Sequence, residues 1–179
     1  MRIYILINDD VLFQPSVLFR LLQRRSGDVC GVGVVGRRKI KKNKNKRPTL
    51  IQLQGLKGFL VLGFYNRFLR ILKYLPLPSF IKIRLSNKDV CSFFKVPHEY
   101  VHDVNDINFI RRLSYLEPDV IISCQGQIFS EELLGVPKIA CINCHPAKLP
   151  KYRGGSPIFS AMIHGENTIG ITAHYDRKG

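Results

Sequence analysis

The 179-residue sequence contains no tryptophan, only two methionines and no long apolar run. Its longest apolar candidate, residues 58–66, spans nine residues without a charge, whereas a helix needs roughly 20 residues to cross a bilayer. Residues 3–7 are too few for the apolar core of a secretory signal, and polar residues 8–10 follow at once. Five cysteines, an odd number without such a signal, favour reduced thiols. We therefore expect a cytoplasmic protein.

Acidic residues are absent from residues 29–88, a window that holds 15 of the 28 lysines and arginines. The other 13 basic residues equal the 13 acidic ones, so the whole net charge of +15 belongs to this window. Its centre, residues 37–47, has eight basic residues in eleven. Such a run is typical of a solvated loop. Its density also suits an anionic partner, either RNA or an anionic membrane surface.

Short apolar strands alternate with helices along most of the chain. Length and ordinary composition, 45% hydrophobic and 23% charged, predict one globular domain with a sizeable core. Alternation of this kind predicts an α/β fold with a mostly parallel, Rossmann-like sheet and helices on both faces. The predicted strands are residues 2–7, 29–35, 96–100, 119–123, 138–143 and 168–175, and the predicted helices are residues 14–25, 105–116 (capped near Asn105 or Asp106), 130–134 and 156–164.

Residues 37–85 form a basic and amphipathic insertion within this alternation. In residues 50–85, apolar side chains recur near helical spacing among lysines and arginines, and Pro76 and Pro78 end the pattern. We favour a helix that packs on the core. The alternative is a basic amphipathic helix at a membrane surface or in the groove of a partner.

Two short motifs are typical of cofactor sites but lack the necessary context. Residues 31–36 fit G-x-G-x-x-G, yet they lie inside an apolar strand, a basic run follows them, and the next acidic residue is Asp89. Residues 141–145 fit the Cys-x-x-Cys-His pattern of haem attachment, but that chemistry needs export. A redox pair would need a helix N-terminus, which the following Pro146 does not favour. We expect neither haem nor metal.

The strongest motif covers residues 143–154, Asn-x-His-Pro-x-x-Leu-Pro-x-Tyr-Arg-Gly, between a predicted strand and a helix that begins with proline. This motif resembles the 10-formyltetrahydrofolate-dependent formyltransferase family, which includes methionyl-tRNA and amino-sugar formyltransferases. The resemblance is close over residues 95–179, loose over 1–35 and slight over 37–90. It implies the Rossmann-like N-terminal domain of that family and 10-formyltetrahydrofolate as co-substrate.

An amide and an imidazole two positions apart at a strand end face the same side, where they can stabilise an oxyanion and move a proton. The resemblance implies these catalytic roles for Asn143 and His145. Arg153 would order the turn or contact an anionic substrate. By analogy, the backbone of a loop after the preceding strand would line the pterin pocket, which comprises Gln125, Gly126, Gln127, Ile128 and Phe129.

The resemblance also implies a catalytic aspartate 36 positions after His145, which is position 181. The sequence ends at Gly179. We therefore expect residues 1–179 to be a C-terminally incomplete formyltransferase-like domain that is inactive or severely impaired as given. The favoured acceptor is methionyl-tRNA, and the alternative is a nucleotide-linked amino sugar. A different class remains open: a non-catalytic protein on the same fold that binds RNA or a membrane surface.

Overall fold

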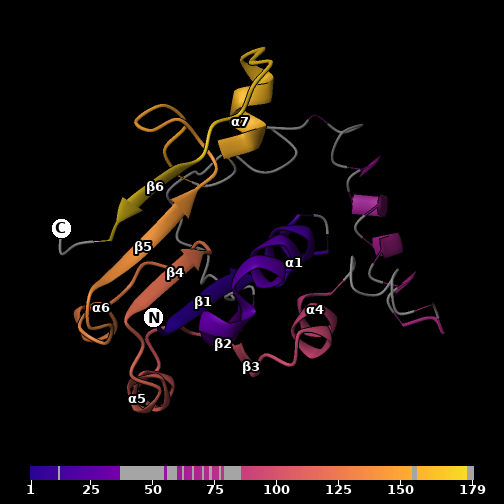
Figure 1. The fold of residues 1–179 in the computed structure, drawn as a ribbon. Coiled ribbons are helices and arrows are strands. Elements are labelled where there is room, and N and C mark those ends of the chain that lie inside the picture. The colour runs from indigo at the N-terminus through magenta and orange to yellow at the C-terminus, as the bar shows by residue number, and fades with distance from the viewer. Residues whose placement is uncertain are drawn as a thin grey trace.

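A computed structural model describes residues 1–11, 13–36, 86–154 and 157–176, together with scattered residues between 55 and 78. The basic run at 37–47 lies outside the described residues. Six strands form one sheet within the described part of the chain, in the order β3-β2-β1-β4-β5-β6 (Figure 1). The bounds of the strands are Ile3–Asn8 (β1), Val29–Val35 (β2), His98–Val101 (β3), Val120–Cys124 (β4), Ala140–His145 (β5) and Thr172–Tyr175 (β6).

Strands β1 to β5 pair in parallel, and β6 runs antiparallel to β5. The predicted mostly parallel, Rossmann-like sheet is therefore confirmed. The helices cover both faces as predicted, since α1 and α4 contribute buried residues to one side of the sheet and α5 and α6 to the other (Figure 1). The bounds of the helices are Gln14–Arg25 (α1), Asn87–Phe93 (α4), Ile107–Tyr115 (α5), Glu131–Leu134 (α6) and Pro157–Ile163 (α7).

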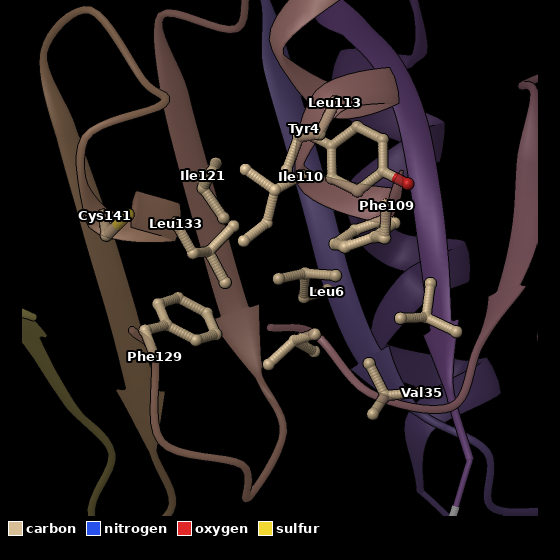
Figure 2. Packing of buried hydrophobic residues seen from close by; sticks show 12 residues of the cluster. Tyr4, Leu6, Val35, Phe109, Ile110, Leu113, Ile121, Phe129, Leu133 and Cys141 are labelled. Atoms are coloured by element: carbon tan, nitrogen blue, oxygen red, sulfur yellow. The ribbon is translucent and has the colours of Figure 1, made fainter. Parts of the chain in front are cut away.

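Side-chain alternation along β1 divides the core between the two faces. Tyr4 and Leu6 join the cluster under α5 and α6, while Ile3, Ile5 and Ile7 join the cluster under α1 and α4. Successive side chains of a strand point to opposite faces, so a strand covered on both sides reads as continuously apolar. Figure 2 shows the first cluster, in which helix and loop side chains pack over β1 and β4.

The glycines of the G-x-G-x-x-G pattern make room for this core. They lie in and just after β2, beside β1. A Cβ on Gly31 would come within 2.8 Å of the Tyr4 ring, and one on Gly33 within 2.7 Å of Leu6 Cδ2. Both glycines therefore accommodate core side chains at a strand interior. The packing of the core thus accounts for these glycines without a dinucleotide site.

The amphipathic part of the insertion departs from the prediction. Several of its described residues are helical. We predicted that this helix packs on the core. That prediction is wrong for most of the described apolar side chains of the segment, because they are exposed. The exposed residues are Leu60, Val61, Phe64, Tyr65, Phe68, Ile71, Tyr74 and Leu75. Within the described residues, no helix combines the length and apolar character that a membrane span requires.

Candidate active site

The order of the strands reverses beside β1. The chain runs outward from β1 through β2 to β3, then returns to place β4 on the other side of β1. Open α/β sheets bind ligands at the carboxyl ends of the strands where the order reverses in this way. The loop at 125–130 follows β4 at this edge, and Asn143 and His145 end the neighbouring β5.

Asn143 and His145 lie on the same face of β5 as the buried Cys141, which belongs to the α5–α6 side of the core. Both are half-buried. His145 Nε2 lies 3.2 Å from the carbonyl oxygen of Tyr152. Because a carbonyl oxygen only accepts hydrogen bonds, Nε2 must be the donor in this contact. Nδ1 is then available for a second hydrogen bond. The structure gives the Asn143 amide no hydrogen-bond partner among the described residues, so its N–H groups can serve a ligand.

The turn after β5 is tied down around Tyr152. Tyr152 has a φ of 58°, in the left-handed region. Its hydroxyl donates to Glu166 Oε1 at 2.9 Å, and Lys151 Nζ lies 3.0 Å from the same oxygen. Thr172 Oγ1 accepts from the backbone N–H of Leu149 at 3.1 Å. These bonds hold the carbonyl that orients the His145 ring.

The loop at 125–130 is anchored through Gln127. Its Oε1 accepts from the backbone N–H of Val104 at 3.1 Å, and its Nε2 donates to the carbonyl of His102 at 2.9 Å. Gln125 folds back over the loop, because its Nε2 donates to the Gln127 carbonyl at 2.8 Å and its Oε1 accepts from the Gln127 N–H. The side chains of both predicted glutamines therefore hold the backbone of the loop in place.

Asn105 supplies a second anchor for this loop. Its Nδ2 donates to the carbonyl of Ile128 at 2.9 Å, and its Oδ1 accepts from the N–H of Ser130 at 2.8 Å. We had predicted Asn105 or Asp106 as the cap of α5, and Asp106 is that cap, with Oδ1 accepting from the Asn108 and Phe109 N–H groups. Asn105 is thus a positioning residue that the sequence signal did not separate from its neighbour.

The remaining loop residues differ in burial. The Phe129 side chain is 9% exposed and packs in the core (Figure 2). The Ile128 side chain is 89% exposed, and Gly126 is also exposed, with open space where a Cβ would lie. Because its side chain lies in the core, Phe129 can offer a ligand only its backbone groups, whereas Gly126 and Ile128 are accessible. Arg153 is exposed as well, and the described hydrogen bonds of the turn come from other residues.

His174 is a candidate residue that sequence reasoning missed. It lies directly opposite Asn143 in the β5–β6 ladder, and opposite residues of antiparallel strands share a face. Its Nδ1 lies 3.9 Å from Asp176 Oδ1. Burial raises the pKa of the Asp176 carboxyl above its ordinary value, and His174 opposes that rise. The sequence alone does not show that His174 lies opposite Asn143, because this depends on the antiparallel pairing of β5 and β6.

The positive end of α1 faces the same edge, and a carboxylate of the chain already occupies it. Asp10 Oδ1 accepts from the backbone N–H groups of Phe13 and Gln14 at 3.0 and 3.3 Å. Helix N-termini attract anions through such groups. Gln14 Nε2 donates to the carbonyl of Cys124 at 3.1 Å. The Asp10 carboxylate therefore already accepts from two of the N–H groups at the start of α1.

The cysteines of the Cys-x-x-Cys-His pattern do not face a common site. Cys141 is buried on the α5–α6 side, while Cys144, three positions on, points to the opposite face. There the side chains of Cys124 and Cys144 interact, and this interaction lowers the pKa of Cys144 to about 7 and raises the pKa of Cys124. No group of three or more His, Cys, Asp or Glu side chains in the described ranges is arranged to hold a metal ion.

The sequence pattern of the family described as "Formyl transferase" matches residues 83–179. A stretch of 122 residues is 37% identical to the bifunctional polymyxin resistance protein ArnA of Wigglesworthia glossinidia brevipalpis, covering 67% of this chain and 18% of that protein. A stretch of 75 residues is 45% identical to methionyl-tRNA formyltransferase of Clostridioides difficile (strain 630), covering 41% and 24%. The chain therefore aligns with about a fifth to a quarter of the length of these curated relatives.

Solved structures share the fold. The phosphoribosylglycinamide formyltransferase of Anaplasma phagocytophilum has a TM-score of 0.58 at 18% identity, covering 100% of this chain and 66% of that one. The corresponding enzyme of Bacillus halodurans has a TM-score of 0.57 at 14% identity, covering 100% and 73%. At these identities the likeness concerns the fold alone.

Proposed function

This chain belongs to the formyl transferase family, and on that premise we propose that the protein transfers a formyl group from 10-formyltetrahydrofolate to a primary amine. The observation that carries the proposal is the placement of Asn143 and His145. They share one face of β5 at the carboxyl edge of the sheet, beside the anchored loop at 125–130. We place the reaction in the cytoplasm.

The reaction joins the amine nitrogen to the formyl carbon and breaks the bond between that carbon and the folate nitrogen. Asn143 would donate an amide N–H to the oxyanion that develops on the formyl oxygen. His145, protonated on both ring nitrogens, would stabilise the same charge while Tyr152 holds its ring. A proton from the amine ends on the folate nitrogen. Preorganised donors of this kind contribute roughly 3–4 kcal/mol each.

The folate would bind against the loop at 125–130. The residues fit this role because the loop presents backbone groups at Gly126 and an exposed apolar side chain at Ile128. The side chains of Gln127 and Asn105 hold this loop against the segment between β3 and α5. The predicted binding set, Gln125 to Phe129, thus remains the proposed pocket, with Phe129 contributing backbone only.

Methionyl-tRNA is the favoured acceptor. The name of the Clostridioides difficile relative supports it, and the +15 charge confined to residues 29–88 suits a large polyanion. The nucleotide-linked amino sugar is the second candidate. The Asp10 carboxylate accepts from two backbone N–H groups at the start of α1 and so disfavours an acceptor phosphate at that helix end. Arg153 stays a predicted contact for an anionic acceptor.

The test uses a chain that extends past position 181, where the family resemblance places an aspartate. We expect Asn143→Ala and His145→Ala each to lower formyl transfer to methionyl-tRNA by roughly 10²- to 10³-fold. Asn108→Ala, an exposed asparagine on α5, is the matched control and should keep full activity. Equal activity in the extended parent chain and all three variants would exclude the assigned catalytic roles. It would favour the alternative of a non-catalytic binding protein. Activity on a nucleotide-linked amino sugar but not on methionyl-tRNA would show that the amino sugar is the acceptor.

A further inference from the structure

A stripe of large apolar side chains projects into solvent from the insertion. Leu60, Phe64, Phe68 and Ile71 are 58%, 75%, 49% and 57% exposed, and all four are helical. Their spacing of four, four and three residues places them on one face of a helix. Figure 1 draws the described parts of this segment at the right of the view, apart from the sheet and from the helices α1 and α4.

Exposure varies among the other apolar residues of the segment. Leu69 and Leu72, which fall outside the stripe at helical spacing, are half-buried. Val61 and Tyr65, which also fall outside it, are 67% and 50% exposed, so the exposed apolar surface is wider than the stripe itself. Contiguous exposed apolar surface of this kind marks a contact with a partner or a membrane.

Charge identifies the partner. The stripe lies within residues 29–88, which hold 15 lysines and arginines and no acidic residue. Arg67 is exposed beside the stripe, and Lys57, Arg70 and Lys73 accompany it in the sequence. An RNA would neutralise these cations but leave the apolar stripe in water. A second copy of the chain would oppose two segments of the same charge.

We propose that the stripe of Leu60, Phe64, Phe68 and Ile71 binds the surface of an anionic lipid bilayer. The apolar side chains would enter the boundary between headgroups and acyl chains, and the exposed Arg67 would contact lipid phosphates. Formyl transfer does not require this contact. The inference therefore stands or falls independently of the proposed reaction.

The absence of tryptophan from the chain makes insertion directly measurable. Phe64→Trp places a single fluorophore in the stripe with little change of shape. Tyr115→Trp, at an 81% exposed position on α5, is the control. We expect vesicles of phosphatidylcholine and phosphatidylglycerol to shift the Phe64→Trp emission to the blue and to leave Tyr115→Trp unchanged. Vesicles of phosphatidylcholine alone should produce a much smaller shift.

Sedimentation of the full chain with the same vesicles separates insertion from charge attraction. Phe64→Glu with Phe68→Glu should lower the fraction bound roughly tenfold. Ile107→Glu with Tyr115→Glu adds the same two charges at exposed sites on α5 and should retain most of the binding. An equal loss of binding in both double variants would show that only net charge matters and would overturn the proposal. So would binding to tRNA without binding to anionic vesicles.

Discussion

At the scale of single residues, strand pairing gives two neighbouring thiols different acidities. The interaction with the Cys124 side chain lowers the pKa of Cys144 to about 7 from the ordinary 9.0. A thiol with a lowered pKa forms thiolate at lower pH, so its alkylation should rise through about pH 7 and level off above it. Cys124→Ala removes this interaction and should raise the midpoint pH.

Mass spectrometry of the Cys144 peptide after iodoacetamide treatment at a series of pH values measures the midpoint. Cys91 and Cys141 are internal controls, because burial raises the pKa of each to about 12. A Cys144 midpoint near 9 in the unsubstituted chain would contradict the assignment. So would a midpoint that Cys124→Ala leaves in place.

Phe129 and Ile128 are adjacent residues whose side chains have opposite environments. Phe129 is 9% exposed in the core under α5 and α6, whereas Ile128 is 89% exposed. We expect Phe129→Ala to lower the free energy of unfolding by about 3–5 kcal/mol. Ile128→Ala should change it by no more than about 0.5 kcal/mol. Urea denaturation of both variants tests the contrast, and a similar loss in both would place the loop differently.

At the scale of elements, the loop at 125–130 owes its position to the segment between β3 and α5. Gln127→Ala would remove the bonds to His102 and Val104 and leave those backbone groups unpaired, at a cost of about 1–3 kcal/mol. We expect faster amide hydrogen exchange across 125–130. Gln23→Ala, at an exposed position of α1, is the control. Unchanged protection in Gln127→Ala would show that other contacts hold the loop.

Local signals predicted most elements. The bounds of α1 and β2 match the prediction, and Asp106, one of the two residues predicted to cap α5, is its cap. The helix α4 was not predicted, since seven residues are too few for propensity alone to stabilise. Its buried Val90 and Cys91 instead join the core beside α1. Such an element depends on partners distant in sequence.

At the scale of the whole molecule, the charge is divided between a basic segment and an electrically neutral remainder. If the acceptor is methionyl-tRNA, replacing the eight lysines and arginines of residues 37–47 by glutamine should weaken tRNA binding. It should also make the salt dependence of that binding shallower, because fewer phosphate counterions are released. Filter binding over a range of salt concentrations measures both quantities. An unchanged slope would remove this run from the tRNA interface.

The sequence by itself determined the α/β class, the family resemblance and the Asn143–His145 pair, because alternation, capping and an extended motif are local properties of the chain. Tertiary structure decided which groups meet. Only the β5–β6 pairing brings His174 opposite Asn143, and only strand parity separates Cys141 from Cys144. Packing beside β1 gives the β2 glycines their role. These outcomes depend on the register and burial of residues far apart in sequence, which no local pattern specifies.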